Sequence, residues 1–290
     1  MQADFDKALT QDLGKDTFVN WVLEFTACIR ECDDAISNLK SWMKDECVHT
    51  PMLVGPGKSY IQNEPMGVVV VLGSWNYPIG TLIPPVISAI AAGNAVVAKP
   101  SEMAPWTAQI TKRLFGRNMD TNCYQCVNGG VEIAKRSTST PSDLIVFTGS
   151  TEKGKLVAAS AAKNLVPCIL ELGGKCPFIV DKGCDLDYAA NKCATVGFMN
   201  SGQLCIRSDY VLIESSLANP FIAKLKEYIK KGFSDKSALG NVINQFHHDR
   251  LCKLMADHQG AVVVGNANAS EDKNLTPSVI LNPSPDSPIM

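Results

Sequence analysis

Hydrophobic residues recur at helical spacing in the first part of the chain. Between residues 8 and 44 they are Phe18, Val22, Phe25, Ile29, Ile36 and Leu39. Polar and charged residues fill the positions between them, which is typical of an amphipathic helix. The pattern predicts one or two long helices, followed by a loop at 51–57 where proline and glycine interrupt it.

The pattern then changes to short apolar runs rich in β-branched residues. These runs lie at 68–72, 95–98, 144–147, 169–170 and 178–180. Stretches of helical character, such as 84–92 and 154–163, separate them. Apolar strands that alternate with helices indicate an α/β fold with a parallel sheet buried on both faces, as in a Rossmann-like domain.

A second α/β set follows towards the end of the chain. Its predicted strands and helices lie at 210–213, 219–232, 245–258 and 261–264. A chain of 290 residues, 46% of them hydrophobic, can bury the cores of two domains. We predict N-terminal helices and a cofactor-binding domain over 1–172, and a catalytic domain over 173–290.

Composition narrows the classes of partner. The net charge of -2 and the pI near 6.1 give no electrostatic basis for binding nucleic acid or an anionic membrane. The first residues lack the apolar core of a signal peptide, and no apolar run approaches the ~18 residues of a membrane span. Eleven scattered cysteines, an odd number, favour reduced thiols over a disulfide scaffold. We therefore expect a cytoplasmic protein.

Two residues supply the groups that covalent catalysis at a carbonyl requires. Glu171 stands in a glycine-ended strand as a candidate base, and Cys205 follows a predicted helix as a candidate nucleophile. Most cysteines in proteins are buried structural thiols, but Cys205 comes after a Ser-Gly-Gln turn at 201–203, where a substrate can approach the backbone. All four histidines are far away in sequence, so a Cys-His hydrolase has little support.

Polar residues also follow three of the predicted strands. Lys99 and Glu102 can bond ribose hydroxyls, although a solvated loop with a Ser-Glu helix start explains them as well. Asn76, flanked by aromatic residues, can donate to an oxyanion or form a turn. Gly149 and Ser150 begin a G-x-x-x-x-G segment that suits an anion at a helix start, and a plain strand–turn–helix junction is the alternative.

The remaining cysteine pairs favour no separate chemistry. Cys123 and Cys126 have redox-motif spacing, but strand alternation places them on opposite faces. Cys28 and Cys32 are predicted to pack in the N-terminal helix, and no second ligand pair lies nearby. We predict no metal site.

Five segments taken together resemble the aldehyde dehydrogenase superfamily, in order as well as in spacing. They are Trp-Asn-Tyr-Pro (75–78), Ala-Ala-Gly-Asn-Ala-Val-Val-Ala-Lys-Pro-Ser-Glu (91–102), Phe-Thr-Gly-Ser-Thr-Glu-Lys-Gly (147–154), Leu-Glu-Leu-Gly-Gly-Lys (170–175) and Ser-Gly-Gln-Leu-Cys (201–205). The resemblance covers essentially the whole chain. The helical N-terminus is most similar to the class 3 and fatty aldehyde dehydrogenase branch.

The resemblance implies a reaction and a role for each matching residue. Cys205 corresponds to the nucleophile, Glu171 to the general base, and Asn76, with the backbone N–H of Cys205, to the oxyanion hole. An aldehyde would be oxidised to a carboxylic acid through a thiohemiacetal and a thioester on Cys205, with NAD or NADP as hydride acceptor. The residues implied to bind the cofactor are Trp75, Lys99, Glu102, Gly149, Ser150 and Gly154.

The chain departs from the family pattern at two places. Leu204 stands where relatives often have threonine or another small residue, which implies a reshaped pocket beside the sulfur. Residues 275–290 resemble the stretch just before the family's Glu-Glu-Ile-Phe-Gly-Pro motif. We therefore expect a C-terminally truncated form with an incomplete catalytic domain. Such a form would lack the dimerisation strand of a full-length homodimer and any C-terminal membrane anchor.

Two other functions are compatible with these residues. One is a catalytically impaired remnant that binds nucleotide or acts through protein contacts, for which the expected truncation is the support. The other is a coenzyme-A-dependent acylating aldehyde dehydrogenase, which needs the cysteine but not the base. Glu171 argues against this last function.

Overall fold

The computed structural model describes residues 1–233, 239–265 and 273–290, and these residues form two compact units. The Rossmann-like unit comprises 21–102 and 111–171, and the C-terminal unit comprises 1–20, 103–110 and 172–290. The first helix therefore belongs with the C-terminal part of the chain. The assignment of 1–172 to cofactor binding and 173–290 to catalysis stays a prediction.

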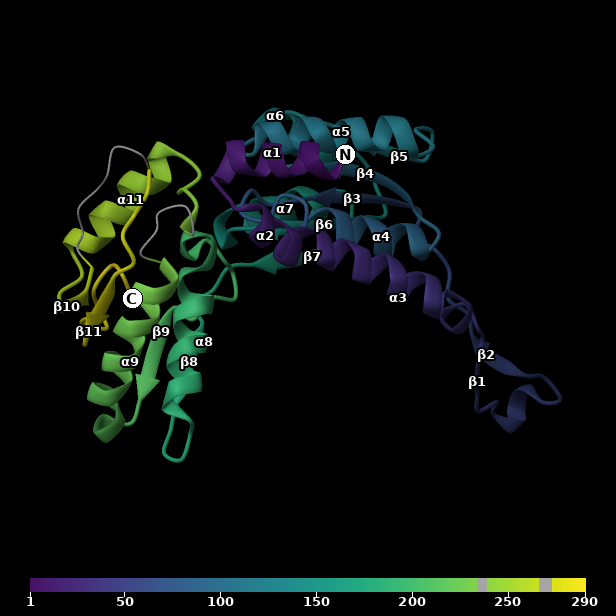
Figure 1. Ribbon diagram of the computed structural model, residues 1–290. Coiled ribbons are helices and arrows are strands. Elements are labelled where there is room, and N and C mark those ends of the chain that lie inside the picture. Colours follow the sequence, from purple (N-terminus) through teal and green to yellow (C-terminus); the bar gives the residue numbers. More distant parts are fainter. Residues whose placement is uncertain (234–238, 266–272) are drawn as a thin grey trace. The chain divides into compact units, whose positions relative to one another are not determined.

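A five-stranded sheet forms the centre of the Rossmann-like unit (Figure 1). Its strands, in spatial order, are β5 (Tyr124–Cys126), β4 (Ala95–Lys99), β3 (Val68–Leu72), β6 (Leu144–Gly149) and β7 (Cys168–Leu172). β3 is parallel to both β4 and β6, and β4 is parallel to β5. The predicted parallel sheet is therefore confirmed.

Helices cover both faces of this sheet, because successive side chains of β3 point to opposite sides. Val69 and Val71 pack with α4 (Ile83–Ala91) and with Phe115 of α5 (Pro105–Asn118). Val70 and Leu72 belong to a second core with residues of α7 (Thr151–Ala162) and α6 (Val131–Ser139). Because both faces of β3 are covered, successive residues of the run at 68–72 are apolar rather than alternating with polar ones.

The N-terminal helical stretch is more interrupted than its apolar spacing predicts. It consists of α1 (Gln2–Leu13), α2 (Thr17–Asn20), the π-helical turn η1 (Trp21–Phe25) and α3 (Thr26–Trp42). Gly14, at φ 65°, ends α1. A π-helical turn takes an additional residue, so apolar positions before and after it do not share one face. Four side chains of the predicted apolar face are exposed, namely Phe18 (71%), Val22 (45%), Ile29 (47%) and Ile36 (78%).

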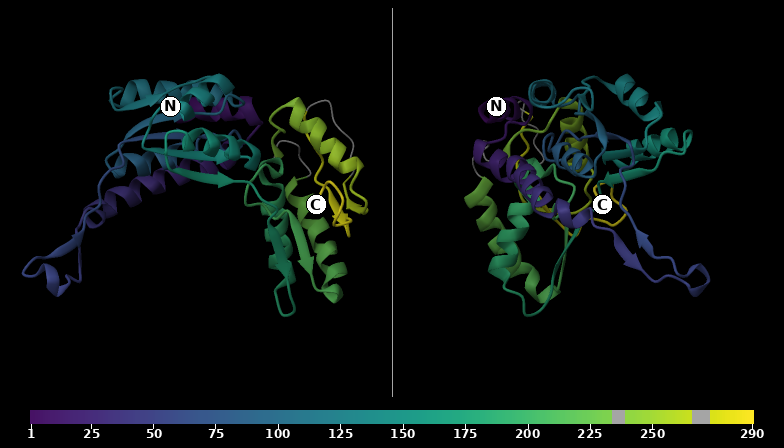
Figure 2. Two further views of the ribbon diagram at one scale, coloured as in Figure 1. Left: turned by 180° about the vertical axis from the view of Figure 1, so that it is seen from behind. Right: turned by 90° about the vertical axis from the view of Figure 1, so that its right-hand side faces the viewer.

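The loop predicted at 51–57 joins the two strands of a hairpin. β1 (Glu46–Val48) and β2 (Ser59–Ile61) pair antiparallel, and the 3-10 turn η2 (Met52–Val54) lies between them. This hairpin extends away from the sheet of its unit (Figure 2). It contributes no strand to the sheet and no residue to either of its cores.

Glu24 in the π-helical turn is fully buried. Its Oε2 accepts hydrogen bonds from the backbone N–H groups of Ile79 (3.1 Å) and Gly80 (2.7 Å). A buried N–H group without an acceptor is costly, so a carboxylate suits this position. Glu24 therefore fixes the segment that follows β3.

The C-terminal unit contains the predicted second α/β set. β8 (Pro177–Val180) and β9 (Tyr210–Ile213) are parallel, and they pack with α8 (Leu186–Phe198) and α9 (Ser215–Phe233) around a core that includes Ala190, Phe221 and Leu225. α11 (Gln245–Ala256) leads to β10 (Ala261–Val264), which pairs antiparallel with β11 (Val279–Leu281). Within the described ranges, no helix combines the length and the apolar character needed to span a bilayer.

We predict that Glu24→Met lowers the free energy of unfolding by about 2 kcal/mol, because the buried N–H of Ile79 and the partly buried N–H of Gly80 lose their acceptor. Glu24→Gln keeps one acceptor oxygen but loses the charge, so its effect is expected to be smaller. Urea unfolding followed by fluorescence measures both changes. Glu64→Gln, at an exposed position of the same unit, is the control. Equal stability of Glu24→Met and the control would contradict the anchoring role.

Candidate active site

Most of the predicted site residues lie at one edge of the Rossmann-like sheet. β3 is in register with both of its neighbours, so that Leu72 stands opposite Lys99 of β4 and opposite Phe147 of β6. The segments that follow these three strands therefore leave the sheet side by side. Ligands of open α/β sheets bind at this carboxyl edge. The structure thus brings together the three segments that carry Asn76, Lys99 and Ser150.

Lys99 and Glu102 form an ion pair at the end of β4. The Lys99 side chain is buried, and its Nζ donates to Glu102 Oε2 (2.7 Å) and to the carbonyl oxygen of Pro100 (3.0 Å). Partial burial of Glu102 raises the pKa of its carboxyl. The hydrogen bond from Lys99, a hydrogen bond from the backbone N–H of Glu102 and the charge of Lys99 together outweigh this effect and lower that pKa below its ordinary value of 4.5. The Glu102 carboxyl is therefore ionised near neutral pH, and the pair presents a donor and an acceptor at this edge.

The junction between β6 and α7 is arranged for an anion. Ser150 is the N-cap of α7, and its Oγ accepts from the backbone N–H of Lys153. Glu152, in the first turn, has a lowered pKa because its own backbone N–H and Ser150 donate hydrogen bonds to its carboxylate. The helix start thus favours a negative charge. At Gly149, the last residue of β6, a Cβ atom would approach the Phe147 ring to 2.5 Å, so a side chain there would require this ring to move. Gly154, in the first turn of α7, is buried.

Asn76 lies in the segment after β3, and a neighbouring serine orients it. Ser74 Oγ donates to Asn76 Oδ1 at 2.6 Å, so the amide accepts from Ser74 and its donor group is Nδ2. Ser74 N in turn donates to Thr81 Oγ1 (2.9 Å), and Thr81 Oγ1 donates to the carbonyl oxygen of Tyr77 (2.9 Å). Trp75 is half-buried beside Asn76. The chain of hydroxyl groups supports the orientation that an oxyanion donor requires.

Cys205 is exposed and follows a turn of unusual backbone conformation in the C-terminal unit. Three consecutive residues, Asn200, Ser201 and Gly202, have φ of 55°, 55° and 70°. Left-handed conformations are unfavourable for residues other than glycine, so other contacts must hold this turn.

Those contacts come from a segment about 40 residues later in the chain. Gln203 Nε2 donates to the carbonyl oxygen of Asn241 (3.0 Å), and Gln203 Oε1 accepts from the N–H of Ile243 (3.0 Å). Ser201 Oγ lies 3.0 Å from the carbonyl oxygens of Leu239 and Gly240. The turn is therefore fixed on both sides, and it presents the thiol that follows it.

Glu171 is exposed on β7, the strand that lies next to β6 at one side of the Rossmann-like sheet. Asn76 belongs to this same unit, whereas Cys205 belongs to the C-terminal unit. The joint action of Cys205, Glu171 and Asn76 accordingly remains a prediction.

The cysteine pair at 123 and 126 does not form a redox centre. All eleven are free thiols. Burial raises the pKa of Cys126 to about 12, whereas Cys123 is exposed, so the two do not face each other as a redox pair would. Among the described residues, no group of three or more His, Cys, Asp or Glu side chains is arranged to hold a metal ion.

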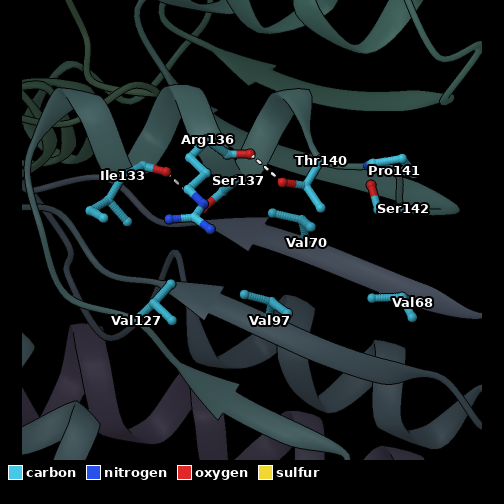
Figure 3. Close-up of a pocket in the computed structure, with 10 residues that line it drawn as sticks. All are labelled: Val68, Val70, Val97, Val127, Ile133, Arg136, Ser137, Thr140, Pro141 and Ser142. Carbon is cyan, nitrogen blue, oxygen red and sulfur yellow. Dashed lines mark hydrogen bonds between the residues drawn. The ribbon is translucent and has the colours of Figure 1, made fainter.

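A cavity of about 310 Å³ lies between α6 and the neighbouring strands of the Rossmann-like sheet. Its floor consists of valines of β3 and β4, and the guanidinium of Arg136 lies between them and the helix (Figure 3). The complete lining is Val68, Val70, Val97, Val127, Ile133, Arg136, Ser137, Thr140, Pro141 and Ser142. It includes none of the predicted site residues, so it is not the predicted active site.

Comparison with known proteins decides the family. The profile of the aldehyde dehydrogenase family matches residues 1–290. The chain belongs to this family. Its relatives include the dimeric NADP-preferring aldehyde dehydrogenase of Rattus norvegicus, 39% identical over 287 residues, and aldehyde dehydrogenase family 3 member B2 of Mus musculus, 37% identical over 287 residues. The predicted similarity to the class 3 branch is confirmed.

Solved structures of the family share the fold. The substrate-bound AldH of Staphylococcus aureus superposes with a TM-score of 0.94 at 34% identity, covering 99% of this chain and 64% of that one. The NAD+ complex of an aldehyde dehydrogenase from Mycobacterium tuberculosis has a TM-score of 0.86 at 26% identity, covering 95% of this chain and 59% of that one. The aldehyde dehydrogenase fold is therefore confirmed. The alignment with the rat relative covers 98% of this chain but 63% of the length of that relative.

Several residues that shape the site were not predicted from the sequence. Ser74 and Thr81 orient Asn76, and Glu24 fixes the backbone beyond it. Cys176 lies against the backbone of Cys205, with its Sγ 3.2 Å from the Cys205 carbonyl oxygen. Only the Ser-x-Asn spacing at 74–76, which suits a local hydrogen bond, gives a signal in the sequence.

We predict that Lys99→Met raises the pKa of Glu102, because the variant removes both the hydrogen bond and the positive charge that lower it. Since the folded pKa lies below the unfolded one, the Lys99–Glu102 pair stabilises the chain above pH 4.5 and loses that contribution as the pH falls through the folded pKa. NMR titration of labelled glutamate carboxyl carbons measures the shift.

The pKa of Glu152 is the control in the same titration. Groups at the start of α7 lower it, so Lys99→Met should leave it unchanged. A Glu102 resonance that titrates identically in the variant would show that Lys99 does not set its charge.

Proposed function

We propose that this chain carries the chemistry of an NAD(P)-dependent aldehyde dehydrogenase, which oxidises an aldehyde to a carboxylic acid. The observation that carries the proposal is the exposed thiol of Cys205 on its anchored left-handed turn. Strained backbone at an exposed nucleophile is characteristic of catalytic sites. Membership of the aldehyde dehydrogenase family supports the assignment.

The polar groups at the carboxyl edge of the sheet fit a dinucleotide. The start of α7, which already favours the carboxylate of Glu152, suits a pyrophosphate. The Lys99–Glu102 pair offers a donor and an acceptor for ribose hydroxyls, and Trp75, Gly149, Ser150 and Gly154 complete the proposed binding set. When bound, the nicotinamide supplies the hydride acceptor. The rat relative is NADP-preferring and the Mycobacterium protein was solved with NAD+, so either cofactor is compatible with the family.

The residues of the chain would act in sequence. The Cys205 thiolate adds to the aldehyde carbon, and Asn76 Nδ2 together with the Cys205 backbone N–H stabilises the oxyanion of the resulting thiohemiacetal. After hydride departure, a thioester remains on Cys205. Glu171 removes a proton from water, and the water then attacks the thioester carbonyl to release the carboxylic acid and regenerate the thiolate. We further propose a cytoplasmic location, and a homodimer for the complete protein.

We predict that Cys205→Ser abolishes NAD(P)H formation from a medium-chain or aromatic aldehyde, because a hydroxyl without an adjacent base is a poor nucleophile. The variant should still bind nucleotide, as measured by calorimetry. NAD(P)H absorbance measures the reaction, and Cys184→Ser, at another exposed thiol of the C-terminal unit, is the control. Unchanged turnover in Cys205→Ser would refute the nucleophile. Nucleotide binding without NAD(P)H formation by the unmodified chain would favour the non-catalytic remnant.

Glu171→Gln is expected to separate the two halves of the reaction. Acylation does not need the base, so a burst of NAD(P)H should survive. Steady-state turnover should fall about 10²- to 10⁴-fold, because thioester hydrolysis does need it. Stopped-flow absorbance resolves the two phases. Loss of the burst together with turnover would assign Glu171 another function, and a coenzyme-A thioester as product would indicate the acylating reaction.

A further inference from the structure

Cys176 and Cys205 are brought together by neighbouring strands of the C-terminal unit. Cys176 immediately precedes β8, and Cys205 lies shortly before β9. These two strands are parallel, with Pro177 opposite Tyr210. The amino ends of both strands, and the cysteines before them, therefore stand next to each other.

Two contacts hold the segments in this arrangement. The Asp209 N–H donates to the carbonyl oxygen of Cys176 at 3.1 Å. Lys175 Nζ lies 2.5 Å from Asp209 Oδ2 and donates to the carbonyl oxygen of Ile289 at 2.8 Å. The segment before β8 is thus attached to the segment before β9 at Lys175 and at Cys176.

The thiol of Cys176 points at Cys205. Its Sγ lies 3.2 Å from the carbonyl oxygen of Cys205, which is two covalent bonds from the Cys205 Cα. Cys205 is exposed, and Cys176 is half-buried. The Cys176 sulfur therefore lies against the Cys205 backbone. A disulfide needs Cα atoms within about 7 Å of each other, and joining the two sulfurs requires rotation of both side chains and movement of the exposed turn.

The nearest alternative thiols in this unit are placed differently. Cys193 is buried within α8 in the apolar core that includes Ala190 and Phe221. Cys184 is exposed in the connection between β8 and α8, at the other end of β8 from Cys176. Within the described part of the chain, neither Cys184 nor Cys193 forms a hydrogen bond with Cys205.

We propose that Cys176 is a resolving thiol, which forms a reversible disulfide with Cys205 when a hydroperoxide oxidises the nucleophile. This inference rests on the proposed function for the importance of Cys205, but the disulfide itself can be tested without it. The pair is a modification site: it removes the nucleophile from reaction and keeps it from irreversible oxidation.

The chemistry needs one equivalent of hydroperoxide as oxidant. The Cys205 thiolate attacks one peroxide oxygen, the O–O bond breaks, and hydroxide leaves; two electrons pass from sulfur to the peroxide, and a sulfenic acid remains. The Cys176 thiol then attacks the sulfenic sulfur, an S–S bond forms, and its proton leaves with the hydroxyl as water. A dithiol reductant returns both thiols by exchange through a mixed disulfide.

Non-reducing peptide mapping of the whole chain after treatment with hydrogen peroxide tests the proposal. The expected product is a cross-linked peptide pair containing Cys176 and Cys205, with the mass of the two peptides less two hydrogens, which dithiothreitol separates. In Cys176→Ala, Cys205 should instead accumulate as sulfinic acid, which dithiothreitol does not reverse. Cys184→Ala is the matched control and should give the same cross-link as the unmodified chain.

The possible results distinguish this inference from the proposed function. Sulfinic Cys205 with a free Cys176 in the unmodified chain, or a cross-link from Cys205 to Cys184, would overturn it. A Cys176–Cys205 disulfide in a chain without dehydrogenase activity would support the resolving thiol and contradict the proposed function. Dehydrogenase activity that depends on Cys205, with no disulfide and with the same oxidation of Cys205 in Cys176→Ala as in the unmodified chain, would support the proposed function and contradict the resolving thiol.

Discussion

The parallel register of β3 with β4 and β6 is the constraint on which the candidate site depends. Because Leu72, Lys99 and Phe147 stand side by side, the segments that follow these strands must leave the sheet at one edge. The pairing of the strands, and not the distance along the chain, therefore decides which of these segments are neighbours. Residues separated by about 75 positions, such as Asn76 and Ser150, reach the same edge because the backbone hydrogen bonds of the sheet place them there.

Buried and half-buried polar side chains hold the segments that regular secondary structure does not. Glu24 accepts the N–H groups of Ile79 and Gly80, and Gln203 bonds the backbone of Asn241 and Ile243. In each case a side chain takes the place of a missing strand or helix partner. The two candidate catalytic groups nearest to these anchors, Asn76 and Cys205, therefore lie on irregular backbone that is nevertheless fixed.

The sequence was sufficient to predict the elements whose signal is local. Apolar β-branched runs marked β3, β4 and β6, and glycine-rich junctions marked the ends of those strands. The π-helical turn at 21–25 and the three-residue strands β1, β2 and β11 were not predicted, because their conformation depends on partners distant in sequence. The exposure of Ile36 has the same origin, since periodicity reports that a helix has an apolar face but not whether that face is covered.

The site residues divide in a similar way. The Lys99–Glu102 pair is three positions apart, and its ion pair is local. The approach of Cys176 to Cys205, 29 residues away, follows from the pairing of β8 with β9 and has no signature in either segment. Tertiary contacts of this kind become visible only once strand neighbours are known.

The left-handed turn at Asn200–Gly202 also imposes an order of events during synthesis. A ribosome releases the chain from its N-terminus, so Cys205 emerges before Leu239, Gly240, Asn241 and Ile243, to which the turn is bonded. Without those acceptors and donors, three consecutive left-handed residues are unfavourable, and a nascent chain that ends before them has no reason to adopt the turn. The candidate nucleophile Cys205 thus acquires its final backbone geometry only after the ribosome has moved well beyond its codon.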